Sequence, residues 1–212
     1  MVVVGTGTEV GKTWVTAHLA RALRRAGHTV AARKPAQSFG PGEDPAATDA
    51  AILGAATGQR AEAVCPPERW YPVAMAPPMA ARALGRPGFT AADLAAEVAV
   101  SWPVDPAADI GLVETAGGVR SPQADDGDAV DLVSLLAPDV VLLVADAGLG
   151  VINAVRLSVD ALGDERLVVV LNRFDPDDDV HDQSRSWLEN HHGLATLSLP
   201  GTETALLRAV LV

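Results

Sequence analysis

Residues 5–13 read Gly-Thr-Gly-Thr-Glu-Val-Gly-Lys-Thr and carry the chemistry that the rest of the sequence has to position. They follow the apolar run 2–4, so a buried strand is expected to enter a glycine-bearing turn, with a helix beginning at the lysine. Backbone N–H groups in such a turn and the positive end of a helix form a cradle for anions. Lys12 would face β- and γ-phosphate oxygens, and Thr13 would offer a hydroxyl to Mg²⁺. The sequence therefore predicts a nucleoside triphosphate site, with contacts from Glu9, Val10, Gly11, Lys12 and Thr13.

This loop departs from the usual phosphate-binding pattern G-x-x-x-x-G-K-[ST]. That pattern requires glycine at position 6, where this chain has Thr6. The preceding glycine is Gly5, one residue further back, and Gly7 lies inside the loop. The loop is thus predicted to be a variant that is one residue longer. An ordinary strand-to-helix turn with a solvated lysine is the alternative, but strand, glycines, Lys-Thr and helix rarely share one register by accident.

Four polar side chains, Lys12, Lys34, Glu114 and Asn172, fall where predicted strands end. Because the carboxyl ends of parallel strands lie at one edge of a sheet, these side chains are expected to converge. Lys34 is either a second cation facing the γ-phosphate or a surface lysine. Glu114 is either a metal ligand or water-orienting carboxylate, or a solvated acid. Asp49 opens a predicted helix, where simple capping of the helix dipole competes evenly with metal ligation.

Apolar runs alternate with segments of helical periodicity along the whole chain. Strands are predicted at 2–4, 29–32, 110–113, 140–145, 167–171 and 194–198, and helices at 12–26, 49–56, 90–102, 130–137, 151–162, 181–191 and from 203. This alternation implies right-handed crossovers and an α/β fold, a doubly wound and mostly parallel sheet with helices on both faces. The length fits a single domain over 1–212. The proline-rich stretch 59–80 is interpreted as an irregular excursion on the substrate side of that domain.

The composition of the chain limits the partners and the compartment that can be expected. The formal charge of −11 argues against non-specific binding to nucleic acid or to an anionic membrane. The single cysteine, Cys65, cannot form an internal disulfide, which favours a reducing compartment. No basic segment precedes the first apolar run, and the longest apolar stretch, 140–145, is too short to span a bilayer. A soluble, cytoplasmic protein is expected.

Several segments together resemble the dethiobiotin synthetase family, in that family's order and roughly its spacing. They are the loop 5–13, Lys34-Pro35-Ala36-Gln37-Ser38, Glu114-Thr115-Ala116-Gly117-Gly118, Gly148-Leu149-Gly150-Val151-Ile152-Asn153, and Asn172. The resemblance implies a P-loop NTPase fold, ATP and Mg²⁺ as cofactors, and a homodimer. It also implies an ATP-dependent carboligase in biotin biosynthesis, which closes a cyclic urea from 7,8-diaminopelargonate and CO₂ through a phosphorylated carbamate.

The same resemblance implies a role for each matching residue. Lys12 and Thr13 would hold phosphates and Mg²⁺, with Asp49 and Glu114 completing the metal shell. The carbamate and the diamine end would contact Thr8, Lys34 and Ser38, and the substrate channel would be lined by Gly117 and Gly118. The substrate's carboxylate tail, across the dimer interface, would meet Leu149, Gly150 and Asn153. Adenine would be read by Asn172 and the turn Pro200-Gly201.

The chain also departs from the family's pattern. Position 115 is Thr where the family usually has Gly, and Pro77-Pro78 stands where the family has Ser-Pro. Phe39 follows Ser38 where a glycine is common, and the loop 120–128 is acidic. Thr115 places a Cβ-bearing residue near the phosphates, but the match as a whole stays intact for ATP and weakens around the diamine.

Two other functions remain open at this stage. One is a related ATP-dependent ligase or amidoligase acting on another carboxylate or carbamate. The other is a partitioning-type ATPase switch that dimerises on ATP, although the signature lysine of such switches is missing from positions 6–10.

Overall fold

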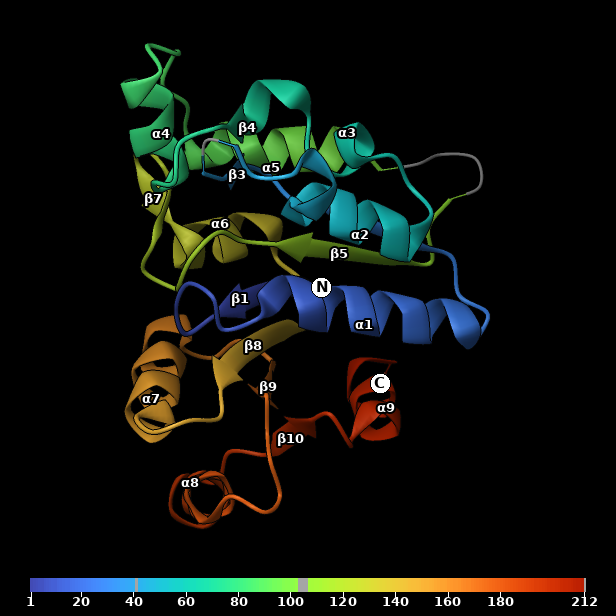
Figure 1. Cartoon of the computed structure of the whole chain (residues 1–212), viewed down its shortest axis with the longest axis vertical. Coiled ribbons are helices and arrows are strands. Elements are labelled where there is room, and N and C mark those ends of the chain that lie inside the picture. The colour runs from blue at the N-terminus through green and yellow to red at the C-terminus, as the bar shows by residue number, and fades with distance from the viewer. Residues whose placement is uncertain (41, 103–106, 212) are drawn as a thin grey trace.

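The computed structural model describes residues 1–40, 42–102 and 107–211 and is built around a six-stranded parallel sheet (Figure 1). The strand order is β10-β9-β8-β1-β5-β2. The six strands are β1 (Val2–Gly5), β2 (Val30–Arg33), β5 (Ile110–Glu114), β8 (Val141–Asp146), β9 (Leu167–Asn172) and β10 (Thr196–Leu199). Two small sheets lie beside it, β3 (Gln37–Ser38) with β4 (Trp70–Tyr71), and β6 (Pro122–Ala124) with β7 (Gly127–Asp128).

Helices connect the strands, and they begin where the sequence offers caps. Thr90 and Asp93 form a capping box at the start of α5, and Asp128 and Asp131 form another at α6. The helices described are α1 (Lys12–Arg25), α2 (Asp49–Thr57), α3 (Ala61–Val64), α4 (Pro77–Ala83), α5 (Ala91–Val100), α6 (Ala129–Leu136), α7 (Val151–Leu162), α8 (Asp179–His192) and α9 (Glu203–Leu211).

The sheet is covered on both faces, as the alternation of its buried side chains requires. Val3, Leu142 and Val170 belong to one core cluster with residues of α1, α2 and α9. Val4 and Leu143 belong to a second cluster with residues of α5, α6, α7 and α8. The predicted doubly wound parallel fold is therefore confirmed, with element boundaries shifted by one or two residues at most ends.

The stretch 59–80 is more regular than the sequence predicts, although residues 74–77 do line the cavity described below. It contains the helix α3, the strand β4 and the start of α4. Pro77 and Pro78 occupy the first positions of α4, where a backbone N–H is not needed by the helix, so prolines there begin the helix rather than prevent it. Among the described residues no helix is both long and apolar enough to cross a bilayer.

Candidate active site

The loop between β1 and α1 has the conformation that its glycines allow. Glu9 and Gly11 have positive φ angles of 61° and 88°. A Cβ atom at Gly5 would lie 3.0 Å from each of three atoms, the Gly7 carbonyl oxygen, the Lys12 Cδ and the Val10 Cγ2. The first glycine of the loop is thus needed at position 5, under the lysine side chain, which explains why Thr6 is tolerated at the usual glycine position.

Lys12 joins this loop to the loop that follows β5. Its ammonium donates to the carbonyl oxygens of Gly7 at 3.1 Å and Gly117 at 2.7 Å. Burial and, to a smaller extent, the neighbouring charge of Lys34 together lower the pKa of Lys12 to about 8. Lys12 is therefore a cation that lacks a full counter-charge at its site.

Lys34, at the end of β2, lies between two carboxylates. Its ammonium is 2.8 Å from Asp49 Oδ2 and 2.9 Å from Glu114 Oε1, and it also donates to the Thr115 carbonyl oxygen at 3.2 Å. Burial alone would lower the pKa of Lys34, but the two carboxylates outweigh it and raise that pKa above the ordinary value for lysine. Burial likewise acts to raise the pKa of Asp49, yet the Lys34 charge keeps it below the usual range. Lys34 is not a surface lysine.

Thr13 brings a hydroxyl oxygen to the same carboxylates. Its Oγ lies 2.7 Å from Asp49 Oδ1 and 2.8 Å from Glu114 Oε1. The other Glu114 oxygen accepts a hydrogen bond from Thr16 at 2.8 Å. Because the Thr13 hydroxyl carries one proton, it can donate to only one of its two carboxylate neighbours at a time. The Thr13 Oγ, Asp49 Oδ1 and Glu114 Oε1 atoms therefore lie close together, and a single hydroxyl proton cannot satisfy both carboxylates.

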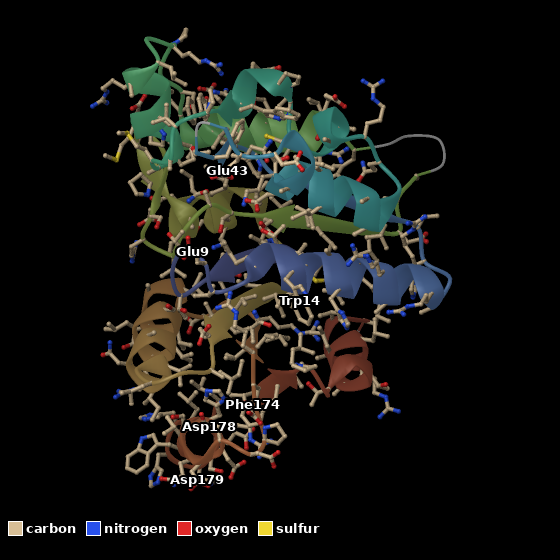
Figure 2. All side chains as sticks on the ribbon, in the orientation of Figure 1. Glu9, Trp14, Glu43, Phe174, Asp178 and Asp179 are labelled. Carbon is tan, nitrogen blue, oxygen red and sulfur yellow. The ribbon has the colours of Figure 1, made fainter. Side chains whose placement is uncertain are left out.

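Lys12, Lys34 and Asp49, together with Thr13, line a cavity of about 690 Å³. Glu9, on the phosphate loop, and Glu43, after β3, also line it (Figure 2). Nine of the predicted site residues line this cavity, namely Thr8, Glu9, Gly11, Lys12, Thr13, Lys34, Ser38, Asp49 and Gly117. The Ser38 hydroxyl is buried there with no hydrogen-bond partner among the described residues, so it is available to a ligand.

Other predicted residues lie outside that lining. Glu114 is fully buried behind Thr13 and Lys34, and the Val10 side chain is part of the core. Gly118 is not among the residues that line this cavity, and it packs against the phosphate loop, where a Cβ would lie 3.1 Å from the Thr6 carbonyl oxygen. The residues predicted to meet the substrate's carboxylate tail line a separate cavity of about 410 Å³ at the start of α7. They are Leu149, Gly150 and Asn153.

The predicted adenine contacts come together at the ends of β9 and β10. The Asn172 amide nitrogen donates to the Val10 carbonyl oxygen at 3.0 Å, which ties β9 to the phosphate loop. Its amide oxygen accepts no hydrogen bond within the described part of the chain and so remains available to a ligand. Asn172 is the register partner of Leu199, and Pro200 and Gly201 follow directly.

Three side chains that shape the site were not predicted. Arg173 pairs with Asp146 and donates to the Glu9 carbonyl oxygen at 2.9 Å, across the phosphate loop. Its place directly after Asn172, at a strand end, was a signal that could have identified it. Gln37 accepts from the Ala50 amide at 3.0 Å, beside Asp49, and Gln123 exchanges two hydrogen bonds with the Ala116 backbone at 2.9 and 2.7 Å. Nothing local in the sequence marks these glutamines.

The fold and the loop define the class of protein, a P-loop NTPase-type α/β protein. A family model described as an AAA domain matches residues 1–199. The crystal structure of the signal recognition particle receptor FtsY from Elizabethkingia anophelis superposes with a TM-score of 0.53 at 16% identity. That alignment covers 92% of this chain and 56% of the receptor chain, so it shows a shared fold alone.

Relatives of known name identify the family. The ATP-dependent dethiobiotin synthetase BioD of Haloferax mediterranei is 40% identical over 205 residues, which cover 93% of this chain and 82% of that protein. The protein of the same name from Anaeromyxobacter dehalogenans is 39% identical over 188 residues, covering 84% of this chain and 78% of that protein. The chain belongs to the dethiobiotin synthetase family.

The contact between Gly11 and Asn172 gives a prediction about stability. A Cβ at Gly11 would lie 2.1 Å from the Asn172 amide nitrogen, whereas a Cβ at Gly150 would meet nothing within 4 Å. Both glycines precede a helix with similar φ angles, 88° and 97°, so both lose the same left-handed freedom when replaced by alanine. Gly11→Ala should lower the free energy of unfolding by about 1–3 kcal/mol more than Gly150→Ala, because it also overpacks the loop.

Urea unfolding of the two variants measures that difference. In an Asn172→Ala background the excess cost of Gly11→Ala should disappear, since the opposing amide is gone. Equal losses for Gly11→Ala and Gly150→Ala in the original background would contradict the predicted contact.

Proposed function

We propose that the chain forms dethiobiotin, in biotin biosynthesis, from 7,8-diaminopelargonate, CO₂ and ATP. The observation that carries the proposal is the convergence of Lys12, Lys34, Asp49 and Thr13 on one cavity, beside a phosphate loop, in a member of this family. Two ammonium groups and two carboxylates at one site suit a reaction that moves a phosphoryl group onto an anionic acceptor.

The phosphate loop would bind the triphosphate of ATP through its backbone N–H groups and the start of α1. The Lys12 ammonium now donates to two carbonyl oxygens, and phosphate oxygens would be stronger, charged acceptors. Asn172 and the Pro200-Gly201 turn would contact the adenine, with the free amide oxygen of Asn172 accepting from its amino group.

The oxygen atoms around Thr13 fit a magnesium ion. Mg²⁺ binds oxygen at about 2.0–2.1 Å in octahedral geometry, which puts neighbouring ligands about 2.9 Å apart. The Thr13 oxygen is already 2.7 and 2.8 Å from the Asp49 and Glu114 oxygens. Mg²⁺ usually keeps several water ligands and binds one or two carboxylates together with substrate phosphates, so Thr13, Asp49 and Glu114 would supply only part of its shell. When bound, Mg²⁺ supplies positive charge to the phosphate oxygens.

Lys34 would act on the other reactant. One amine of the diamine attacks CO₂ and loses a proton, which gives a carbamate. A carbamate oxygen then attacks the γ-phosphorus, and the bond to the β-phosphate oxygen breaks to release ADP. We propose that the Lys34 ammonium stabilises the negative charge that develops between the carbamate and the γ-phosphoryl group. Thr8 and Ser38 would orient the carbamate and the diamine end.

Ring closure completes the proposed reaction. The second amine attacks the carbonyl carbon of the mixed anhydride, phosphate leaves, and the amine loses its proton to give the cyclic urea. Gly117, which lines the cavity, would allow the substrate to approach the backbone closely.

The proposal extends to a homodimer with small-molecule substrates and without nucleic acid or membrane partners, in the cytoplasm. Leu149, Gly150 and Asn153 would receive the substrate's carboxylate tail from a neighbouring subunit. Exposed apolar surface supports this part of the proposal, since 95% of Leu149 and 62% of Leu157, which line the same cavity, are open to solvent.

Turnover tests the reaction directly. Phosphate release from Mg·ATP and bicarbonate should depend on 7,8-diaminopelargonate, and mass spectrometry should detect the cyclic urea. Lys34→Met removes the charge but keeps an unbranched side chain, so turnover should fall about 100-fold or more. Because the change also leaves Asp49 and Glu114 without their ammonium partner, circular dichroism has to show that the variant is folded before its ATP binding and turnover are compared. Lys12→Ala should remove ATP turnover.

Two results would contradict these roles. If the protein binds ATP but the diamine does not stimulate phosphate release, the phosphate site is retained and the substrate has to be another carboxylate. Full activity in Lys34→Met would exclude the proposed role of Lys34 in phosphoryl transfer.

The pKa of Lys12, lowered to about 8, predicts a pH dependence of ATP binding. Phosphates bind the charged ammonium, so above pH 8 the free protein must take up a proton when ATP binds. The dissociation constant for ATP should be about tenfold larger at pH 9 than at pH 7. Lys12→Arg keeps its charge over this range, so its constant should change far less between the same pH values. Identical pH profiles for the two proteins, measured by calorimetry, would contradict the assignment.

A further inference from the structure

Trp14 is a large aromatic residue directly after the phosphate loop, and the proposed mechanism does not use it. It is 47% exposed, although tryptophan is mostly buried in folded proteins. It lies near the start of α1 (Figure 2) and stacks on His18, one turn further along the helix. The ring centroids are 5.1 Å apart and the ring planes differ by 18°. His18 thus supports one face of an indole, and about half of the Trp14 surface is open to solvent.

The helical phase places this indole on the side of α1 that faces the end of β9. Thr13, which contacts Asp49, and Arg24, which donates to the Ala56 carbonyl oxygen, mark the side of α1 that faces α2. Trp14 instead shares a face with Gly11, three residues earlier, and residues at that spacing are neighbours. A Cβ at Gly11 would touch the Asn172 amide, so that face is the one that meets the end of β9.

The direction of the side chain strengthens this placement. Side chains on an α-helix lean toward its N-terminus, which for Trp14 is toward Gly11 and the Asn172 amide. Asn172 is in register with Leu199, so the Pro200-Gly201 turn lies at the same edge. α9, which follows that turn, packs against α1. Trp14, Asn172 and the turn therefore border one region beyond the phosphate loop.

We propose that Trp14 is a stacking platform for the base of the bound nucleotide. This inference rests on the proposed binding of ATP and adds a residue to it. A base has an aromatic face whatever its identity, so stacking adds affinity without selecting the base. Selection would be left to polar groups such as the Asn172 amide oxygen. Orientation of the indole by His18 before binding would lower the entropic cost of stacking.

The chain contains its own control. Trp187 packs against His191 at the same i, i+4 spacing on α8, with centroids 4.1 Å apart and the ring planes tilted by 30°, and it is 49% exposed. Trp14→Ala and Trp187→Ala thus remove the same side chain from two tryptophan–histidine pairs of similar exposure, one beside the phosphate loop and one on another helix. Circular dichroism and thermal unfolding would establish that both variants are folded.

Calorimetry with two probes, ATP and inorganic tripolyphosphate, tests the proposal. Trp14→Ala should weaken ATP binding about tenfold and leave tripolyphosphate binding unchanged, because only ATP carries a base. Trp14→Phe should recover most of the affinity, and Trp187→Ala should match the original protein with both probes. ATP should also change the tryptophan fluorescence of the original protein and of Trp187→Phe but not of Trp14→Phe.

The outcomes separate this inference from the proposed function. Unchanged ATP affinity in Trp14→Ala would overturn the stacking role and leave the function standing. Equal losses for ATP and tripolyphosphate would also overturn it, because Trp14 would then support the phosphate loop. An original protein that binds tripolyphosphate but not ATP, or neither probe, would overturn the proposed function together with the inference.

Discussion

The buried ion cluster of Lys34, Asp49 and Glu114 is the interaction on which the rest of the site depends. One ammonium lies within 2.9 Å of two carboxylates, and both Lys34 and Glu114 are almost fully buried. Burying charges is costly unless each is paired and hydrogen-bonded, so the three side chains have to be held in one arrangement. Lys34 directly follows β2, Asp49 begins α2 and Glu114 ends β5, and Thr13 and Thr16 connect this cluster to α1. The cluster therefore fixes α1 and its phosphate loop relative to the sheet.

The parallel sheet makes that arrangement accessible. Its strand ends share one edge, so short loops after β1, β2, β5 and β9 bring side chains far apart in sequence into contact. The carboxylates exceed the buried ammonium by one negative charge, and Lys12, held by carbonyl oxygens nearby, adds a positive one. Because these positive and negative charges are balanced, the site can bind polyanionic phosphates together with a divalent cation, whose charges offset one another. The acidic net charge of the chain does not prevent this, because the local charges are closer to the ligand.

The sequence predicted the elements whose signals are local, and missed the contacts that are not. The strands 2–4 and 140–145 and the helix from Lys12 follow from apolar periodicity, and the convergence of Lys34 and Glu114 follows from topology. Pro77 and Pro78 concealed a helix because a proline stops a helix in its interior but is tolerated at its start. Gln37 and Gln123 could not be predicted, since their function is to satisfy backbone groups that only the folded chain brings near them. The position of Gly118, against the phosphate loop, depends on a close approach of two loops that no spacing reveals.

The departures from the family's pattern separate into two kinds when their contacts are compared. Thr115 is fully buried and its hydroxyl donates to the Val3 carbonyl oxygen at 3.3 Å, so it faces β1 and not the cavity. In the acidic loop, Asp126 accepts from the Ala91 amide at 2.8 Å and Asp128 caps α6, which makes these carboxylates part of the scaffold. Phe39 and Pro77 are different, because both line the cavity. If this chain differs from its relatives in the shape of substrate that it accepts, those two side chains are where the difference arises, and the phosphate half of the site is unaffected.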